Sequence, residues 1–218
     1  MSDIAILGTG RVGAALGAKL ASAAHSITFG TRTPDQAREA WSGPPVAFAE
    51  ASSAIRAAEI VVNTTPGATS LPRLTALRED LAGRILVDIA NATERAADGA
   101  MTLLFPNGSL AEALQQALPD TRVTKTLNTM VFMLMTDPAK AGTEQPPTAF
   151  LSGDDDAAKA AVRTLLHDLG WPDEWIEDLG GIASARDPEA FMLFVPHLAR
   201  RHGFVPFGLS LALPPANV

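Results

Sequence analysis

Near its N-terminus the chain carries the hexapeptide Gly8-Thr9-Gly10-Arg11-Val12-Gly13, a G-x-G-x-x-G pattern. The apolar run Asp3–Leu7 before it has a β-branched residue at every second position, which suits a buried strand. Small and apolar residues recur at helical spacing over Val12–Ala23, and a second strand-like run follows at Ser26–Phe29. A strand, a glycine turn, a helix and a strand within about 30 residues form the context in which this pattern binds a dinucleotide.

The three glycines have separate tasks in such a turn. Gly8 permits the tight turn, Gly10 lets backbone N–H groups approach a pyrophosphate, and Gly13 lets the helix pack closely on the strand. The N-terminus of the helix adds the positive end of a dipole. We therefore predict that the dinucleotide is bound by Gly8, Thr9, Gly10, Arg11, Val12 and Gly13.

The end of the second strand indicates which dinucleotide binds. An NAD-selective site usually places an Asp or Glu about 20 residues after the glycines, where it accepts a hydrogen bond from the ribose 2′-OH. Here that position reads Gly30-Thr31-Arg32-Thr33, and the first acid after it is Asp35. An arginine flanked by two hydroxyls would bind a 2′-phosphate that a carboxylate would repel. We predict NADP(H) rather than NAD(H), held by Thr31, Arg32 and Thr33; an ordinary surface role for Arg32 is the alternative.

The composition narrows the class of protein. The 218 residues suffice for one large α/β domain, and 47% hydrophobic with 19% charged residues describes a well-cored chain. A net charge of −7 argues against a nucleic-acid partner, and the absence of cysteine excludes disulfides and thiolate chemistry. No apolar run reaches the roughly 18 residues of a membrane helix, and the first strand begins at once. We expect a cytoplasmic protein without a membrane segment.

Strand-like and helix-like segments alternate along the rest of the chain. This order predicts an α/β fold with a Rossmann-type doubly wound, mostly parallel sheet and a short C-terminal helical extension. We place the dinucleotide-binding core at residues 1–153 and the strand and helix extension, packed on the same domain, at residues 154–218. Further strands are expected at 46–48, 60–65, 85–89, 122–127 and 148–153, and an edge strand within 171–178. Helices are expected at 33–41, 52–58, 70–82, 109–118, 154–169 and 190–201, and a loop at 94–105.

Several loops that follow strands are candidate binding segments, because the carboxyl ends of parallel strands border the cofactor crevice. Thr64-Thr65-Pro66 could line the ribose and nicotinamide side, although a helix-capping turn explains them equally well. Ala90-Asn91 and Asn128-Thr129-Met130 end the next strands. The apolar run Val131–Met135 could shape an adaptable surface or belong to the core.

Other chemistry-bearing residues have simpler explanations. Asp154, Asp155 and Asp156 open a helix, where the dipole favours acids, so we predict no metal site. His197 lies on a helix as a lone histidine and is more typical of a packed residue than of a catalyst. No Ser-His-Asp or Lys-Tyr set is evident. The apolar stretch Gly203–Leu213 could cover the site or pack on a second subunit.

The ordered set of motifs resembles the NADPH-dependent coenzyme F420 reductase family, whose Rossmann core is similar to the reductase domain of the STEAP metalloreductases. The resemblance spans nearly the whole chain. It is carried by Ile6–Gly13, Gly30-Thr31-Arg32, Val61–Pro66, Val87–Asn91, Lys125–Thr129, Ser152–Asp155 and the closing helix with Arg186.

The resemblance implies hydride transfer between NADPH and a flavin-like or deazaflavin acceptor, F420 or FMN or FAD. It assigns the 2′-phosphate pocket to Thr31 and Arg32, and the orientation of the nicotinamide or acceptor ring to Asn128 and Thr129. It also implies a homodimer and no acid–base catalyst. Two positions depart from the family: Gln36 stands where a basic residue is usual, and Met130-Val131-Phe132 replaces an isoleucine or valine, a proline and an alanine.

Two other functions remain open. Reductases of imines or 3-hydroxy acids share the dinucleotide core but generally carry a large helical dimerisation domain, whereas about 65 residues follow Gly153 here. Lys125 lies in a predicted strand rather than on such a helix. The other alternative is an NADP(H)-binding regulator or redox sensor without turnover, which would retain the phosphate residues and lose the acceptor pocket.

Overall fold

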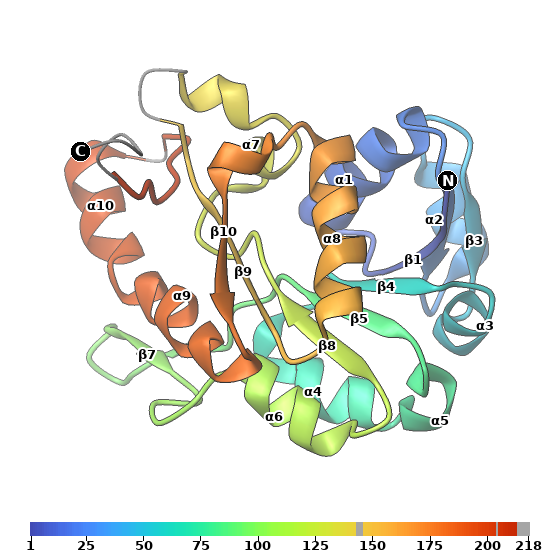
Figure 1. Ribbon diagram of the computed structural model, residues 1–218, viewed down its shortest axis with the longest axis horizontal. Coiled ribbons are helices and arrows are strands. Elements are labelled where there is room, and N and C mark those ends of the chain that lie inside the picture. Colours follow the sequence, from blue (N-terminus) through green and yellow to red (C-terminus); the bar gives the residue numbers. More distant parts are fainter. Residues whose placement is uncertain (143–145, 204, 213–218) are drawn as a thin grey trace.

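One eight-stranded sheet forms the centre of the molecule, in a computed structural model that describes residues 1–142, 146–203 and 205–212 (Figure 1). The strand order is β10-β9-β8-β5-β4-β1-β2-β3. All neighbours pair in parallel except β8 and β9, so the sheet is mostly parallel and Rossmann-like, as predicted. The strands are β1 (Asp3–Leu7), β2 (Ser26–Gly30), β3 (Ala47–Ala49), β4 (Ile60–Asn63), β5 (Ile85–Asp88), β8 (Arg122–Lys125), β9 (Ala149–Gly153) and β10 (Ile176–Gly180).

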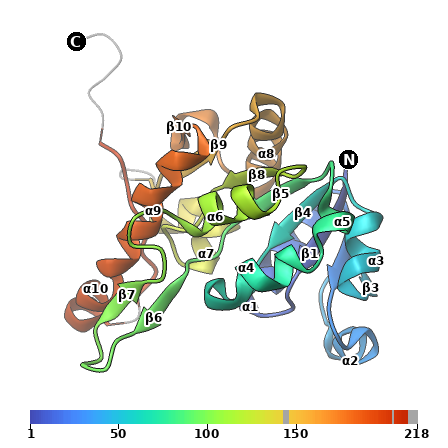
Figure 2. The same cartoon turned by 90° about the horizontal axis from the view of Figure 1, so that it is seen from below.

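Helices cover both faces of this sheet (Figures 1 and 2). They are α1 (Arg11–Ser22), α2 (Pro34–Ala40), α3 (Ala51–Arg56), α4 (Gly67–Thr75), α5 (Arg78–Leu81), α6 (Leu110–Ala117), α7 (Phe132–Met135), α8 (Asp156–Leu169), α9 (Arg186–Ala190) and α10 (Val195–His202). Single turns of 3-10 helix are η1 (Pro138–Ala141), η2 (Asp173–Trp175), η3 (Ile182–Ala185) and η4 (Phe191–Leu193). None of the helices in the described ranges is both long and apolar enough to cross a membrane.

Two hydrophobic cores lie on opposite faces of the sheet, and β1 contributes to both. Ile4 and Ile6 pack with α1 and α8 in one core, whereas Ala5 and Leu7 pack in the other with residues of α3, α4 and α6. A strand buried on both faces must be apolar throughout, which explains the uninterrupted run that begins the chain.

The strand order reverses at β1, because β2 and β3 lie on one side of it and β4, β5 and β8 on the other. Ligands of doubly wound sheets bind at such a reversal, beside the carboxyl ends of the strands. The loops after β1, β4, β5 and β8 all reach this edge, so the fold brings the predicted binding segments together.

Four segments differ from the sequence-based expectations. The helix expected at 70–82 is divided into α4 and α5, which are separated by residues 76–77. Residues 94–105, expected as a loop, contain most of the hairpin β6 (Thr93–Arg95) and β7 (Met101–Leu103), which projects from the sheet in Figure 2. Its strands are too short and too exposed to show a strand pattern. Residues 131–135 contain the helical turn α7. The helix expected at 190–201 is divided into η4 and α10, and Pro196, which has no N–H to donate, lies in the first turn of α10.

The apolar stretch after α10 packs on its own chain. The Val131 N–H donates to the Phe207 carbonyl (3.1 Å), and the Leu209 N–H donates to the Thr129 carbonyl (3.3 Å). This segment therefore lies against the loop that follows β8. Of the two predictions for the stretch, this contact favours the one in which it covers the site. Phe204 and Leu213, which belong to the same prediction, lie outside the described residues.

Candidate functional site

The glycine turn and the start of α1 lie beside open space at Gly10. Gly10 is the N-cap of α1, its cap has no side-chain hydrogen bond, and the first turn of the helix contains no acid. A Cβ atom added to Gly10 would meet nothing within 4 Å. The first N–H groups of a helix lack partners within the helix, so this arrangement fits a pyrophosphate lying over Gly10.

The loop after β4 supports the turn from the other side. Thr64 donates from Oγ1 to the Leu7 carbonyl at 2.8 Å, and the same oxygen lies 3.2 Å from the Gly8 carbonyl. Thr65 Oγ1 donates to Asn63 Oδ1 at 2.6 Å. Both hydroxyls are thus bonded within the chain, which favours the interpretation of these residues as a helix-capping turn. Both residues also line the cavity described below.

The end of β2 places the predicted phosphate residues in solvent. Arg32 and Thr33 are exposed, and Thr31 is half-buried. Arg38, the next arginine, pairs with Asp35 at 2.7 Å. Among the described residues no ion pair or side-chain hydrogen bond engages the Arg32 guanidinium, which leaves it available for an anion.

A cavity of about 610 Å³ opens beside the glycine turn. Its floor consists of the loops after β4, β5 and β8. Of the predicted site residues, those that line it are Arg11, Val12, Thr64, Thr65, Pro66, Ala90, Asn91, Asn128, Thr129 and Met130. Gly8, Thr9, Gly10 and Gly13 form the adjoining turn, and Thr31, Arg32 and Thr33 lie at the end of β2, outside this lining.

The remaining wall is apolar and comes mostly from the C-terminal part of the chain. It consists of Ile89, Val131, Phe132, Met133, Met135, Phe191, Met192, Val195, Ala199, Val205, Pro206 and Phe207, with Gly67 and Gly203. Sequence reasoning had pointed to the run 130–135 and to the apolar C-terminal stretch, but not to their meeting around one cavity. His197 is exposed and does not line it.

Arg11 carries the only ionisable side chain among the described lining residues. Its guanidinium carbon lies 5.8 Å from the centre of the Phe132 ring, within the range of a cation–π contact. Arg11 begins α1 and Phe132 begins α7, so this pair joins the glycine turn to the apolar wall.

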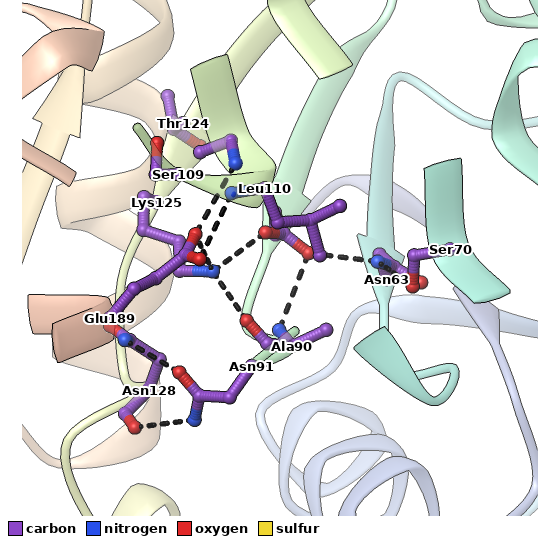
Figure 3. A network of polar contacts seen from close by, with 12 residues as sticks. Asn63, Ser70, Ala90, Asn91, Ser109, Leu110, Thr124, Lys125, Asn128 and Glu189 are labelled. Atoms are coloured by element: carbon purple, nitrogen blue, oxygen red, sulfur yellow. Dashed lines mark hydrogen bonds and ion pairs between the residues drawn. The ribbon is translucent and has the colours of Figure 1, made fainter. Parts of the chain in front are cut away.

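A buried charge network lies beneath the floor (Figure 3). Lys125 is 1% exposed, and its ammonium donates to Asp88 Oδ2 at 2.7 Å, to Glu189 Oε1 at 2.8 Å and to the Ala90 carbonyl. Burial alone would lower the pKa of Lys125, but the two carboxylates outweigh it, so the pKa is raised and the lysine stays charged. Asn63 Nδ2 extends the network by donating to Asp88 Oδ1 at 2.8 Å.

Sequence reasoning missed this network. One available signal was that Asn63, Asp88 and Lys125 are polar or charged residues at or near the ends of three buried strands, because such side chains require partners when they are buried. Glu189 lies on α9, far along the chain, and no local pattern identifies it as the partner of Lys125.

Asn91 and Asn128 clamp two of the floor loops together. Asn91 Nδ2 donates to the Asn128 backbone carbonyl at 2.8 Å, and Asn128 Nδ2 donates to Asn91 Oδ1 at 3.0 Å. Asn128 Oδ1 is buried without a partner among the described residues. The pair fixes the spacing between the ends of β5 and β8, where the cavity floor lies.

Known proteins are similar to this chain in sequence and in fold. The sequence model of the family described as NADP oxidoreductase coenzyme F420-dependent matches residues 3–92. A solved structure from Arthrobacter sp. FB24, provisionally assigned as an F420-dependent NADP reductase, is 40% identical with a TM-score of 0.88 and covers 98% of this chain and 100% of that chain.

More distant relatives match in part. Metalloreductase STEAP3 of Rattus norvegicus is 28% identical over 190 residues, which are 87% of this chain and 36% of that protein. The chain therefore spans about a third of the length of this curated relative. An imine reductase of Streptomyces aurantiacus, 18% identical with a TM-score of 0.60 over 91% of this chain and 61% of its own, shares the fold.

The Arthrobacter structure is matched over its full length at an identity that establishes common family membership, and the family model covers the glycine turn and the three strand ends β2, β4 and β5. This chain belongs to the family of coenzyme F420-dependent NADP oxidoreductases.

Proposed function

We propose that this chain transfers a hydride between NADPH and a flavin-like or deazaflavin acceptor, namely coenzyme F420 or FMN or FAD. The family consists of NADP-dependent oxidoreductases, and the proposal concerns the acceptor and the residues. One observation carries it: the cavity runs from the glycine turn to an apolar wall, and Arg11 of the turn is the only ionisable side chain in its lining among the described residues.

In this proposal the two ends of the cavity bind different molecules. The dinucleotide is held by Gly8, Thr9, Gly10, Arg11, Val12, Gly13, Thr31, Arg32, Thr33, Thr64, Thr65, Pro66, Ala90 and Asn91. The acceptor lies against Asn128, Thr129 and Met130, under the apolar wall. The open space over Gly10 and the free guanidinium of Arg32 support the first assignment, and the Met and Phe side chains of the wall support the second.

Among the described residues the lining contains no acid, which favours a ring as the acceptor. NADPH, when bound, supplies the hydride. An imine or carbonyl that receives it gathers negative charge on one atom and needs a positioned proton donor, whereas a flavin-like ring spreads the charge. The contribution of the protein is then to stack the two rings, to fix their geometry and to exclude water, for which no catalytic side chain is required.

We also propose a homodimer in the cytoplasm, with no nucleic-acid or membrane partner and no resident metal. The division into residues 1–153 and 154–218 stays a prediction; β10, from the second range, pairs with β9 in the same sheet. Light scattering at micromolar concentration tests the dimer, and a mass equal to one chain would contradict it.

The decisive experiment is a titration followed by turnover. NADPH and NADH are titrated separately into the protein, and then F420, FMN, FAD and a cyclic imine are offered in turn while NADPH oxidation is followed. Turnover with one of the three ring compounds supports the proposal. Turnover with the imine alone would make the protein a reductase of another small substrate. Tight NADPH binding without any turnover would favour a regulator or redox sensor.

A further inference from the structure

Two separate contacts attach α9 to α6, and only one of them reaches the cavity floor. On the surface, Arg186 Nη2 donates to Glu112 Oε1 at 2.6 Å. In the interior, the carboxylate of Glu189 accepts from the Leu110 N–H at 2.9 Å and from the Ala111 N–H at 3.3 Å, at the start of α6. The same carboxylate accepts from Lys125, which lies under the floor.

The ammonium of Lys125 has three N–H donors, and all of them are used. One goes to the Asp88 carboxylate at the end of β5, one to the Ala90 carbonyl in the floor loop after β5, and the third to Glu189 on α9. Figure 3 shows the lysine near Glu189 and Ala90, with Asn91 in the same floor loop. The lysine therefore joins β5, β8 and α9 at one point.

One part of the apolar wall begins two residues after Glu189, at Phe191. We call residues 191–203, which comprise η4 and α10, the cover; Phe191, Met192, Val195 and Ala199 are its cavity-lining side chains. No residue of α10 is buried, so its packing on the rest of the molecule is sparse. Apolar contacts are not directional, whereas charge-assisted hydrogen bonds fix both distance and angle.

We propose that Lys125 and Glu189 are positioning residues that hold the cover over the loop after β8, which carries Asn128, Thr129 and Met130, and thereby set the width of the acceptor half of the cavity. That this half takes the acceptor rests on the proposed function above. The coupling between the Lys125–Glu189 ion pair and the cover is independent of the proposed function, and it can be measured without any acceptor.

Glu189→Gln is the informative variant, with Glu112→Gln as its matched control. Glutamine has the shape of glutamate and can still accept from the Leu110 N–H, but it exchanges the ion pair with Lys125 for a neutral contact. Glu112→Gln makes the same chemical change in the other α9–α6 contact, on the surface and away from the floor. Both variants lose one carboxylate that binds a cation, so a difference between them reports the link to the floor.

Hydrogen exchange of the free protein provides the first readout. In Glu189→Gln we expect amide exchange in the cover to rise about tenfold, with exchange over residues 8–20 unchanged, because loss of a buried charge-assisted bond frees the local segment. In Glu112→Gln we expect cover exchange within about twofold of the parent. Equal exchange of the cover in the two variants, or no change in Glu189→Gln, would overturn the proposal.

Steady-state kinetics provide the second readout, with whichever acceptor the parent protein turns over. Glu189→Gln should raise the KM for the acceptor about tenfold while the Kd for NADPH stays within about twofold. An equal loss of affinity for both would contradict a role confined to the acceptor half. If no acceptor is turned over by the parent, the proposed function fails and the exchange result still stands.

Glu189→Asp serves if the glutamine variant does not fold. It keeps the negative charge but is one methylene shorter, so it cannot reach both Lys125 and the start of α6. Faster exchange in the cover, smaller than for the glutamine variant but above that of Glu112→Gln, supports the proposal. Parental exchange in Glu189→Asp would overturn it, because the reach of the side chain would then not matter.

Discussion

A Cβ atom placed on Gly13 would lie 2.2 Å from the carbonyl oxygen of Gly8, a separation that no pair of such atoms can hold. The helix α1 therefore approaches the first strand closely only because position 13 has no side chain. Gly10, between them, faces open space instead. One hexapeptide thus contains a glycine needed for packing and a glycine left free for a ligand.

The first prediction separates these two roles. Gly13→Ala should lower the free energy of unfolding by about 1–3 kcal/mol, because backbone must move to admit the methyl group. Gly10→Ser should leave stability unchanged or raise it, since serine is a good N-cap and the backbone at Gly10 (φ −73°) suits any residue. Its hydroxyl would compete for the N–H groups that bind phosphate, so we expect the NADPH Kd to rise at least about tenfold.

Urea unfolding and NADPH titration of both variants check this prediction. Parental NADPH affinity in Gly10→Ser would mean that the pyrophosphate does not lie over this turn.

The second prediction concerns the choice of cofactor. Arg32→Ala should weaken NADPH binding by about 1.5–3 kcal/mol and leave NADH binding nearly unchanged, because only NADPH offers a 2′-phosphate to the guanidinium. Arg163→Ala is the control, since Arg163 is a surface arginine on α8 that pairs with Asp173. Isothermal titration with both nucleotides gives the comparison, and equal losses for NADPH and NADH would show that Arg32 does not read the phosphate.

The third prediction concerns the acceptor half of the cavity. Ala199→Phe adds a ring to the lining of α10, so the KM for the acceptor should rise at least about tenfold while the NADPH Kd stays within about twofold. His197→Phe adds the same ring on the same helix at an exposed position outside the lining, and should change neither value. A parental KM for Ala199→Phe would exclude this wall from the acceptor site.

The fourth prediction is a pH dependence of stability. The pKa of Glu112 lies below its ordinary value chiefly because Arg186 donates to both carboxylate oxygens; partial burial opposes this effect and Ser109 adds to it. A lowered carboxyl pKa stabilises the fold at pH values above the ordinary pKa, and this contribution is lost as pH falls through the lowered value.

Arg186→Gln should therefore reduce Tm at pH 7 by at most about 2 °C, as expected for an exposed ion pair. The difference from the parent should shrink as pH falls below about 4.5, where Glu112 becomes protonated in the unfolded chain. Thermal unfolding from pH 3 to pH 8 measures both curves. A Tm difference that grows toward acid pH would contradict the assignment.

The sheet and the glycine turn could be predicted because their signals are local. Strands such as β1 and β4 are buried on both faces and read as apolar runs, and the capping pair Ser109 and Glu112 identifies the start of α6. The position of the loops at one edge follows from parallel pairing alone.

The apolar wall and the buried network could not be predicted in this way. Phe207 meets Val131, and Glu189 meets Lys125, across long stretches of chain with no shared periodicity. The hairpin β6–β7 was missed because its strands have no buried face of their own. The wall and the network depend on how segments far apart in sequence pack together, which hydrophobic spacing does not encode.

The return of residues 205–212 to the loop after β8 has a consequence for synthesis. The glycine turn and the ends of β1, β2 and β4 lie within the first third of the sequence and are translated early. Phe207 and Leu209, whose backbone bonds to Val131 and Thr129, are translated much later. In the proposed function, the residues that hold the dinucleotide are therefore translated before the C-terminal part of the acceptor wall. Cleavage near position 205 should then yield a protein that still binds NADPH but lacks the part of the apolar wall that Val205, Pro206 and Phe207 supply.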